Sequence, residues 1–277
     1  AKGTTPHQLV MTATPIPRTL TMALYADMEV SILDELPAGR LPIETRVIAD
    51  TRREEVIARV ARLLASGQQG YWVCPLIDDS EQLPARSVES TIKLLDKALP
   101  AARVGMLHGR LKSPAKAEIM AQFKAAQLQL LVATTVIEVG VDVPNATLMV
   151  IENPERMGLA QLHQLRGRVG RGGLQSHCVL LYKTPLSATG KARLQVVRDS
   201  QDGFHIAEQD LRLRGPGELL GTRQTGEQQF RIADLFEHAK LIPEAVRRGD
   251  ELLTHDPETA EQLLSIWAPQ DSGHRRV

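Results

Sequence analysis

Short apolar runs alternate with helix-spaced segments through the middle of the chain. The apolar runs predict strands at Thr45–Ala49, Gly70–Pro75, Arg103–Leu107, Leu128–Ala133, Thr147–Glu152 and His177–Tyr182. The segments between them predict helices near residues 51–66, 85–99, 114–126 and 158–166. Strands that alternate with helices form a parallel sheet covered on both faces, so the predicted fold class is α/β. In such sheets ligands gather at the carboxyl ends of the strands, and we expect functional side chains just after each strand.

The segments on either side of this pattern predict further pieces. Before it, we expect a strand, a helix and a strand at Gln8–Ala13, Pro17–Ala26 and Val30–Leu33. After it, we expect two helices near 188–200 and 203–213, a Gly-rich loop at 215–226 and two amphipathic helices within 231–267. The predicted organisation is the tail of a preceding domain with a linker (1–42), a sheet domain (43–185), a helical hairpin with its loop (186–230) and C-terminal helices (231–277).

Composition places the chain among ordinary globular proteins, with 43% hydrophobic and 24% charged residues. Aromatic residues make up only 3%, which disfavours stacking on nucleic-acid bases as a main mode of binding. The net charge is zero, but it is unevenly distributed. Residues 160–231 hold eleven Lys/Arg against six Asp/Glu, whereas residues 232–277 hold five against nine. A basic belt therefore precedes an acidic tail.

Cys74 and Cys178 each lie inside an apolar run, which predicts buried thiols in a reducing compartment. No run approaches the roughly 18 apolar residues that a membrane span needs, and no signal peptide opens the chain. We therefore expect a cytoplasmic protein without a membrane partner. The chain begins at Ala1 in the middle of a pattern, and we expect it to be part of a longer protein.

The segment Gln164–Arg171 carries the most specific chemistry. It holds three arginines and two glycines in eight residues, directly after a helix-spaced apolar run. Arginine is planar, always charged and forked toward oxyanions, so arginines at a helix end suit a phosphate chain. Glycines between them let the backbone approach a neighbouring surface. Taken alone, the same residues also fit a solvated basic loop.

Three further segments place polar groups after predicted strands. Thr12-Ala-Thr14 could relay hydrogen bonds between a phosphate and a second domain. Thr134 and Thr135 could offer hydroxyls and free amides to a nucleic-acid phosphate. His108 and Gly109 are similarly positioned to contact a nucleic-acid backbone. Each segment alone fits a structural role better: a strand-ending turn for the threonine segments and a structural histidine for His108.

The stretch that follows Thr135 adds Gly140, which permits close approach, and Asp142, which could accept hydrogen bonds from a ribose hydroxyl. No Gly-x-x-x-x-Gly-Lys-Ser/Thr phosphate loop occurs in the chain. Ser31-Ile-Leu-Asp-Glu35 resembles a metal-binding acidic pair, but it follows the Thr-Ala-Thr segment and is broken by Pro37. We interpret it as a domain-closing strand.

In this order, the segments resemble the later motifs of superfamily 2 helicases. Thr12–Thr14 is similar to motif III, Ala133–Asp142 to motif V and Gln164–Arg171 to motif VI. Residues 186–230 resemble the helical hairpin and loop of double-stranded DNA translocases. Within that group, the wording Asp34-Glu-Leu-Pro, Glu152-Asn-Pro-Glu-Arg156 and Thr222-Arg-Gln-Thr225 resembles the RecG family of bacterial branched-DNA helicases. The resemblance covers roughly residues 7–243.

The resemblance implies a RecA-like sheet domain and a motor driven by ATP with Mg²⁺. It implies that Arg168 and Arg171 reach the γ-phosphate from a second motor domain. Gln164, Gly140 and Asp142 would line the nucleotide. The residues implied in DNA binding or in coupling are Thr12, Thr14, His108, Gly109, Thr134, Thr135, Arg193, Arg214, Arg223 and Gln224.

The implied partner is branched double-stranded DNA, which such motors remodel by fork reversal and Holliday junction migration. The first motor domain, with its phosphate loop and metal site, and the wedge domain that recognises the DNA branch would lie outside this chain. We therefore expect the chain alone not to hydrolyse ATP. Two alternatives stay open: a transcription-repair coupling factor, and a non-catalytic nucleic-acid-binding module that keeps a helicase-like fold.

Overall fold

The computed structural model describes residues 9, 11, 31–33, 35, 39–74, 83–134, 142–214 and 238–267. Within them the chain forms a six-stranded sheet in the order β1-β6-β5-β2-β4-β3, in which every pairing is parallel. The strands are β1 (Glu44–Ala49), β2 (Gln69–Val73), β3 (Val104–Leu107), β4 (Leu130–Ala133), β5 (Ala146–Glu152) and β6 (His177–Tyr182). All six predicted strands are present, and the α/β fold class is confirmed.

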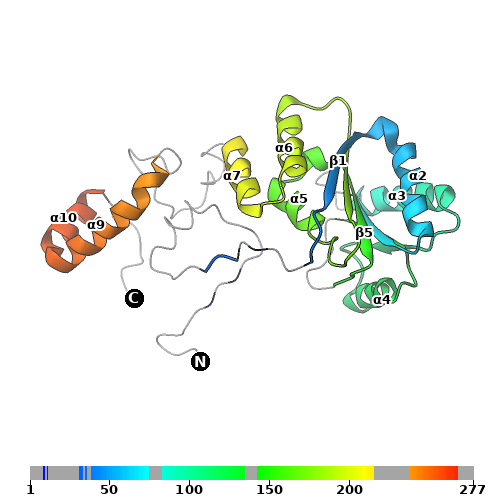
Figure 1. Ribbon diagram of the computed structural model, residues 1–277, viewed down its shortest axis with the longest axis horizontal. Helices are drawn as coiled ribbons and strands as arrows, with labels where there is room; N and C mark the ends of the chain where they lie inside the picture. Colours follow the sequence, from blue (N-terminus) through cyan, green and yellow to red (C-terminus); the bar gives the residue numbers. More distant parts are fainter. Residues whose placement is uncertain are drawn as a thin grey trace. The chain divides into compact units, whose positions relative to one another are not determined.

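Helices cover both faces of the sheet (Figure 1). On one side lie α2 (Arg53–Ala65) and α3 (Leu83–Ala98), and on the other lie α5 (Leu159–Arg166) and α6 (Ala188–Asp199). The chain also forms α4 (Ser113–Lys124), α7 (Gly203–Arg214) and the short turns η1 (Asp50–Arg52) and η2 (Pro154–Arg156). The helices predicted near 51–66, 85–99, 114–126, 158–166, 188–200 and 203–213 are therefore present in the predicted order. The helix predicted at Pro17–Ala26 and the loop predicted at 215–226 lie outside the described residues.

The core divides between the two faces because side chains alternate along each strand. Trp72, Val150 and Val179 face α2 and α3 in one apolar cluster. The neighbouring Tyr71 faces the other way, and its ring lies 5.0 Å from that of Phe123 on α4. All five β2 residues and all seven β5 residues are buried, as expected for central strands of a covered parallel sheet.

Two predicted strands near the start of the chain are not borne out where the structure describes them. Leu9 and Met11, within the predicted strand Gln8–Ala13, lie outside any strand and are 81% and 83% exposed. Ile32 and Leu33, within Val30–Leu33, also lie outside any strand, and Leu33 is 94% exposed. An apolar run becomes a buried strand only against neighbouring strands, and these residues have no such neighbour in the described part of the chain.

The last described helices are η3 (Ala239–Leu241), α9 (Ile242–His255) and α10 (Pro257–Trp267), and α9 and α10 contact each other. They confirm the two amphipathic helices predicted within 231–267. On α9, Arg247 forms ion pairs with Glu244 and Glu251, three and four residues away on the same helix face. None of the described helices has the length and apolar character needed to cross a membrane.

A buried polar group fastens β5 to its neighbours. Glu152, 7% exposed, ends β5, and its Oε1 accepts a hydrogen bond of 2.7 Å from Trp72 Nε1 and another from the Arg53 guanidinium. We predict that Glu152→Gln lowers the free energy of unfolding by about 1–3 kcal/mol, because one buried donor loses its charged acceptor. Urea unfolding of the variant measures this loss.

The matched control is Glu44→Gln, which removes the carboxylate of an exposed ion pair with Arg46. Exposed pairs contribute about 0–1 kcal/mol, so the loss should be smaller. Equal losses for the two variants would contradict the role given to Glu152.

Candidate functional site

Two loops that precede neighbouring strands carry residues that were predicted to contact the nucleotide. Asp142 lies shortly before β5, and Arg168 and Arg171 lie shortly before β6. Because β5 and β6 are adjacent and parallel, with Leu148 opposite His177, both loops lie where these strands begin. Gly172 confirms their contact, since a Cβ on it would lie 2.5 Å from the Pro144 carbonyl oxygen.

This placement corrects one expectation. His108 and Thr134 do follow the strands β3 and β4, but Asp142 and the two arginines precede strands instead. The reason is that α5 returns the chain from the end of β5 to the start of β6, and the arginines follow that helix. The rule about carboxyl ends describes loops that leave strands, and these loops lead into them.

Arg171 is held by two groups of the protein. Its Nη1 lies 3.6 Å from Asp142 Oδ1, and its Nε donates a hydrogen bond of 3.3 Å to the Gly167 carbonyl. The Arg171 side chain is 33% exposed and that of Asp142 is 60% exposed. The end of the motif V segment and the end of the motif VI segment thus form one solvent-accessible ion pair.

Arg168 differs from Arg171 in having no such partner. It is half-buried, and the structure records no hydrogen bond or ion pair between its guanidinium and any described residue. Arg168 and Arg171 both lie close enough to the buried Tyr71 for their positive charges to lower its pKa. Burial nevertheless raises the pKa of Tyr71 to about 12, so its phenol stays neutral beside the two cations.

One of the two glycines between the arginines allows a close approach, as predicted. Gly170 has φ +75°, and a Cβ there would lie 2.9 Å from Ile43 Cγ1, so a larger residue would meet both backbone strain and a clash. Gly167 has an ordinary helical φ of −65°, and a Cβ there would meet nothing nearer than 3.4 Å. The close approach therefore occurs at Gly170 alone.

The first arginine of the run, Arg166, is buried, with 2% exposure. Its Nη1 donates hydrogen bonds to the carbonyls of Val197 (2.5 Å) and Ser200 (2.8 Å), at the end of α6. No role was predicted for Arg166 from the sequence. Its spacing of four residues from the buried Leu162 could have placed it on the inner face of α5.

His163 completes this buried group. Its Nδ1 lies 3.0 Å from Arg166 Nη2, and a guanidinium can only donate, so the histidine nitrogen is the acceptor. Burial and then the adjacent Arg166 charge lower the pKa of His163 to about 4. The ring is therefore neutral at physiological pH.

Gln164, on the same helix, is exposed, and Gly140 lies outside the described residues. The structure thus brings together Asp142, Arg168 and Arg171 among the residues predicted to line the nucleotide. The described part of the chain contains no group of three His, Cys, Asp or Glu side chains that could hold a metal ion.

Three of the candidate DNA-contacting residues, His108, Gly109 and Thr134, lie at the other ends of the strands, after β3 and β4. Gly109 is exposed, and a Cβ there would meet no protein atom within 4 Å. His108 is half-buried, and its Nδ1 has no hydrogen-bond partner among the described residues. The expectation of a free amide is wrong for Thr134, which is 2% exposed and donates its amide to the Leu107 carbonyl at 3.1 Å. That amide extends the pairing of β4 with β3.

Arg193 on α6 is also half-buried and engaged. Its guanidinium donates to the carbonyls of Glu155 and Met157, on either side of the end of η2. Arg214 is the last residue of α7, and its side chain is outside the described set. Thr12, Thr14, Thr135, Arg223 and Gln224 lie outside the described residues altogether.

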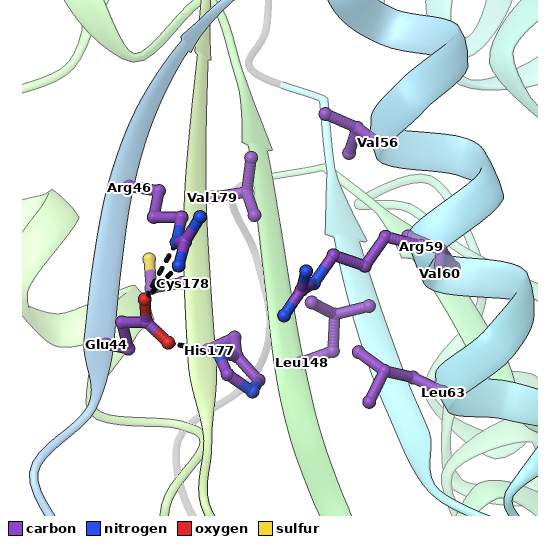
Figure 2. A pocket seen from close by; sticks show the side chains of 10 residues that line it. All are labelled: Glu44, Arg46, Val56, Arg59, Val60, Leu63, Leu148, His177, Cys178 and Val179. Carbon is purple, nitrogen blue, oxygen red and sulfur yellow. Dashed lines mark hydrogen bonds and ion pairs between the residues drawn. The ribbon is translucent and has the colours of Figure 1, made fainter.

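A separate small cavity lies between α2 and the starts of β1 and β6 (Figure 2). Its apolar walls include Val56 and Val179, and Glu44 contacts both Arg46 and His177 at its rim. Its volume of about 30 Å³ is enough for a water molecule and too small for a nucleotide. Val179 lies on the sheet face opposite Tyr71, so this cavity is not part of the arginine site.

Comparisons with known proteins show which family the chain resembles. Residues 55–173 match the family described as helicase conserved C-terminal domain, and residues 200–269 match ATP-dependent DNA helicase RecG, domain 3, C-terminal. The chain is 59% identical over 270 residues to the ATP-dependent DNA helicase RecG of Escherichia coli K12. This chain is a homologue of the C-terminal region of RecG.

The match to the Escherichia coli RecG covers 97% of this chain and 39% of the relative. The RecG of Bacillus subtilis is 44% identical over 256 residues, which cover 92% of this chain and 37% of that protein. A solved structure of RecG bound to a three-way DNA junction shares 43% identity and a TM-score of 0.67, covering 83% of this chain and 30% of that chain. The chain thus spans about two fifths of the length of these curated RecG relatives.

The half-buried His163 predicts a pH dependence of stability. Its folded pKa of about 4 lies below the ordinary 6.5, so between these values the unfolded chain binds a proton that the folded chain does not. Stability from this group should be complete above pH 6.5 and should be lost as pH falls toward 4. In His163→Asn, which does not titrate, the unfolding free energy should depend less on pH across this window.

Chemical unfolding at several pH values between 4 and 7 measures this dependence. The control is His255→Asn, at an exposed position on α9, which should keep the slope of the unsubstituted protein. An unchanged slope in His163→Asn would contradict the burial of a neutral ring.

Proposed function

We propose that this chain is the second motor domain and C-terminal part of an ATP-dependent helicase that remodels branched double-stranded DNA in recombination and repair. The observation that carries the proposal is the half-buried Arg168 guanidinium, which has no recorded partner among the described residues and, like Arg171 and Asp142, lies close enough to Tyr71 to act on its pKa. Homology to RecG over 97% of the chain supports it. The match of residues 200–269 to a RecG domain favours this assignment over a transcription-repair coupling factor.

Arg168 and Arg171 are the residues that we assign to the γ-phosphate of ATP. A guanidinium without a protein acceptor keeps its forked donors for a phosphate, and such an arginine stabilises charge that develops during phosphoryl transfer. Arg171 would exchange its contact with Asp142 for one with the phosphate. Asp142, 60% exposed, would then be available to a ribose hydroxyl, with Gln164 and Gly140 beside the nucleotide.

ATP would supply the hydrolysis energy, with Mg²⁺ held by parts of the protein beyond this chain. This chain would contribute positive charge from one side of a cleft between two motor domains. Closure of the domains would bring Arg168 within reach of the phosphate, and opening would withdraw it.

We assign contacts with the DNA backbone to His108 and Gly109, where open space lies above Gly109. Thr12, Thr14, Thr135, Arg214, Arg223 and Gln224 belong to the same proposal on sequence grounds. Arg193, whose guanidinium is engaged by backbone carbonyls, would serve coupling, because it fixes α6 to η2. Backbone contacts without base readout would suit a motor that moves along any sequence.

We predict that Arg168→Ala, in the full-length protein that carries this chain, lowers DNA-stimulated ATP hydrolysis by on the order of 10³-fold. Binding of ATP should persist, because the rest of the nucleotide site is unchanged. Steady-state ATPase assays with forked DNA, and titration with a fluorescent ATP analogue, measure the two properties.

The matched control is Arg62→Ala, which removes an exposed arginine on α2 and should leave turnover unchanged. Normal turnover in Arg168→Ala would contradict the assignment of this arginine to the phosphate.

A further inference from the structure

Arg166 makes a contact that the proposed roles of Arg168 and Arg171 leave unexplained. Its Nη1 donates to the carbonyl of Val197, in the last turn of α6, and to the carbonyl of Ser200, just after that helix. The last carbonyls of a helix lack partners within it and carry partial negative charge. Arg166 therefore caps the end of α6 from a different helix, 31 and 34 residues earlier in the chain.

This contact carries an energetic cost. Arg166 is 2% exposed, and among the described residues its recorded partners are two carbonyls and the neutral His163 ring, with no carboxylate. A buried cation without an opposite charge is costly, and well-packed apolar side chains of similar volume are often more stabilising at such positions. General stability is thus a weak explanation for an arginine here, whereas its fixed fork suits a defined geometry.

The backbone of Arg166 connects directly to Arg168. The amide of Arg168 donates to the Leu165 carbonyl at 3.0 Å, and the amide of Val169 donates to the Arg166 carbonyl at 3.3 Å. The turn that carries Arg168 therefore continues α5 as a hydrogen-bonded unit. A displacement of Arg168 would move the end of α5, and with it the Arg166 side chain.

A second set of hydrogen bonds, between Gln201 and the Ile43 backbone, holds the turn after α6. Gln201 accepts a hydrogen bond from the Ile43 amide (3.2 Å) and donates one to the Ile43 carbonyl (3.3 Å). Ile43 is also the residue against which Gly170 is closely packed. The turn between α6 and α7 is thus joined to the arginine loop by Arg166 directly and by Gln201 through Ile43.

From these contacts we infer that Arg166 is a positioning residue that couples the arginine loop to the end of α6 and the turn that leads into α7. It transmits the movement of Arg168 and Arg171 at the nucleotide to the end of α6, where the chain turns into α7. The inference rests on the proposed motor function. It assigns Arg166 to the conversion of hydrolysis into movement, and Arg168 to hydrolysis itself.

The test compares two activities of the full-length protein in the same preparation. ATP hydrolysis is measured with duplex DNA, and translocation is measured as displacement of a third strand from a DNA triplex. Their ratio reports the coupling. In Arg166→Met, which keeps the side-chain volume but leaves the Val197 and Ser200 carbonyls without their donor, the translocation obtained per ATP should fall about tenfold, while hydrolysis falls much less.

Arg166→Lys provides the conservative rescue. Lysine keeps the charge and offers rotatable donors without the planar fork, so its ratio should lie between those of Arg166→Met and the unsubstituted protein. Arg103→Met is the matched control, because Arg103 also donates to two backbone carbonyls, those of Ala126 and Gln127, but contacts neither α5 nor α6. Its ratio should not change.

The outcomes separate the two levels of the account. Equal proportional losses of hydrolysis and translocation in Arg166→Met would show a merely structural role and overturn the inference while leaving the motor intact. If thermal melting shows that Arg166→Met does not fold, Arg166→Lys becomes the test. An unchanged ratio of translocation to hydrolysis in Arg166→Lys would then overturn the inference. Absence of both activities in the unsubstituted protein would overturn the proposed function itself.

Discussion

The adjacency of the parallel strands β5 and β6 is the constraint on which the candidate site depends. Parallel neighbours must begin at the same edge of the sheet, so the loops that lead into them are forced together. Asp142 in one loop and Arg171 in the other consequently meet at 3.6 Å. Gly172 packs against the backbone of Pro144 so closely that no side chain would fit between the two loops.

Three arginines from one eight-residue run occupy three different environments. Arg166 is buried on helix-end carbonyls, Arg171 is shared between Asp142 and Gly167, and Arg168 has no recorded partner among the described residues. We propose a different role for each environment. Arg166 holds the end of α6, Arg171 makes a reversible contact beside the nucleotide, and Arg168 stabilises charge at the phosphate. A single basic segment can therefore link catalysis to movement, because its members differ in solvation and not in chemistry.

Most of the fold could be predicted from local patterns in the sequence. All six strands and the helices between them are visible as apolar periodicity, and the arginine run is recognisable by its composition. What the sequence could not give depends on distant partners. The neutral state of His163 depends on burial and on the Arg166 charge, and the role of Arg166 depends on the end of α6, 31 residues away. Thr134 was expected to have a free amide, but that amide donates a hydrogen bond to the carbonyl of Leu107, at the end of β3. The described residues of the strands predicted near the start of the chain lie outside any strand, since an apolar run does not reveal whether it has neighbours.

The central claim is that Arg168 reaches a phosphate while Arg166 keeps its hold on α6. It is tested most directly by an experimental structure of the full-length protein with a non-hydrolysable ATP analogue and forked DNA. The account predicts the Arg168 guanidinium about 3 Å from a γ-phosphate oxygen, with Arg166 still donating to the carbonyls of Val197 and Ser200. A closed, nucleotide-bound structure in which Arg168 points away from the phosphates, or in which Arg166 has released α6, would contradict it.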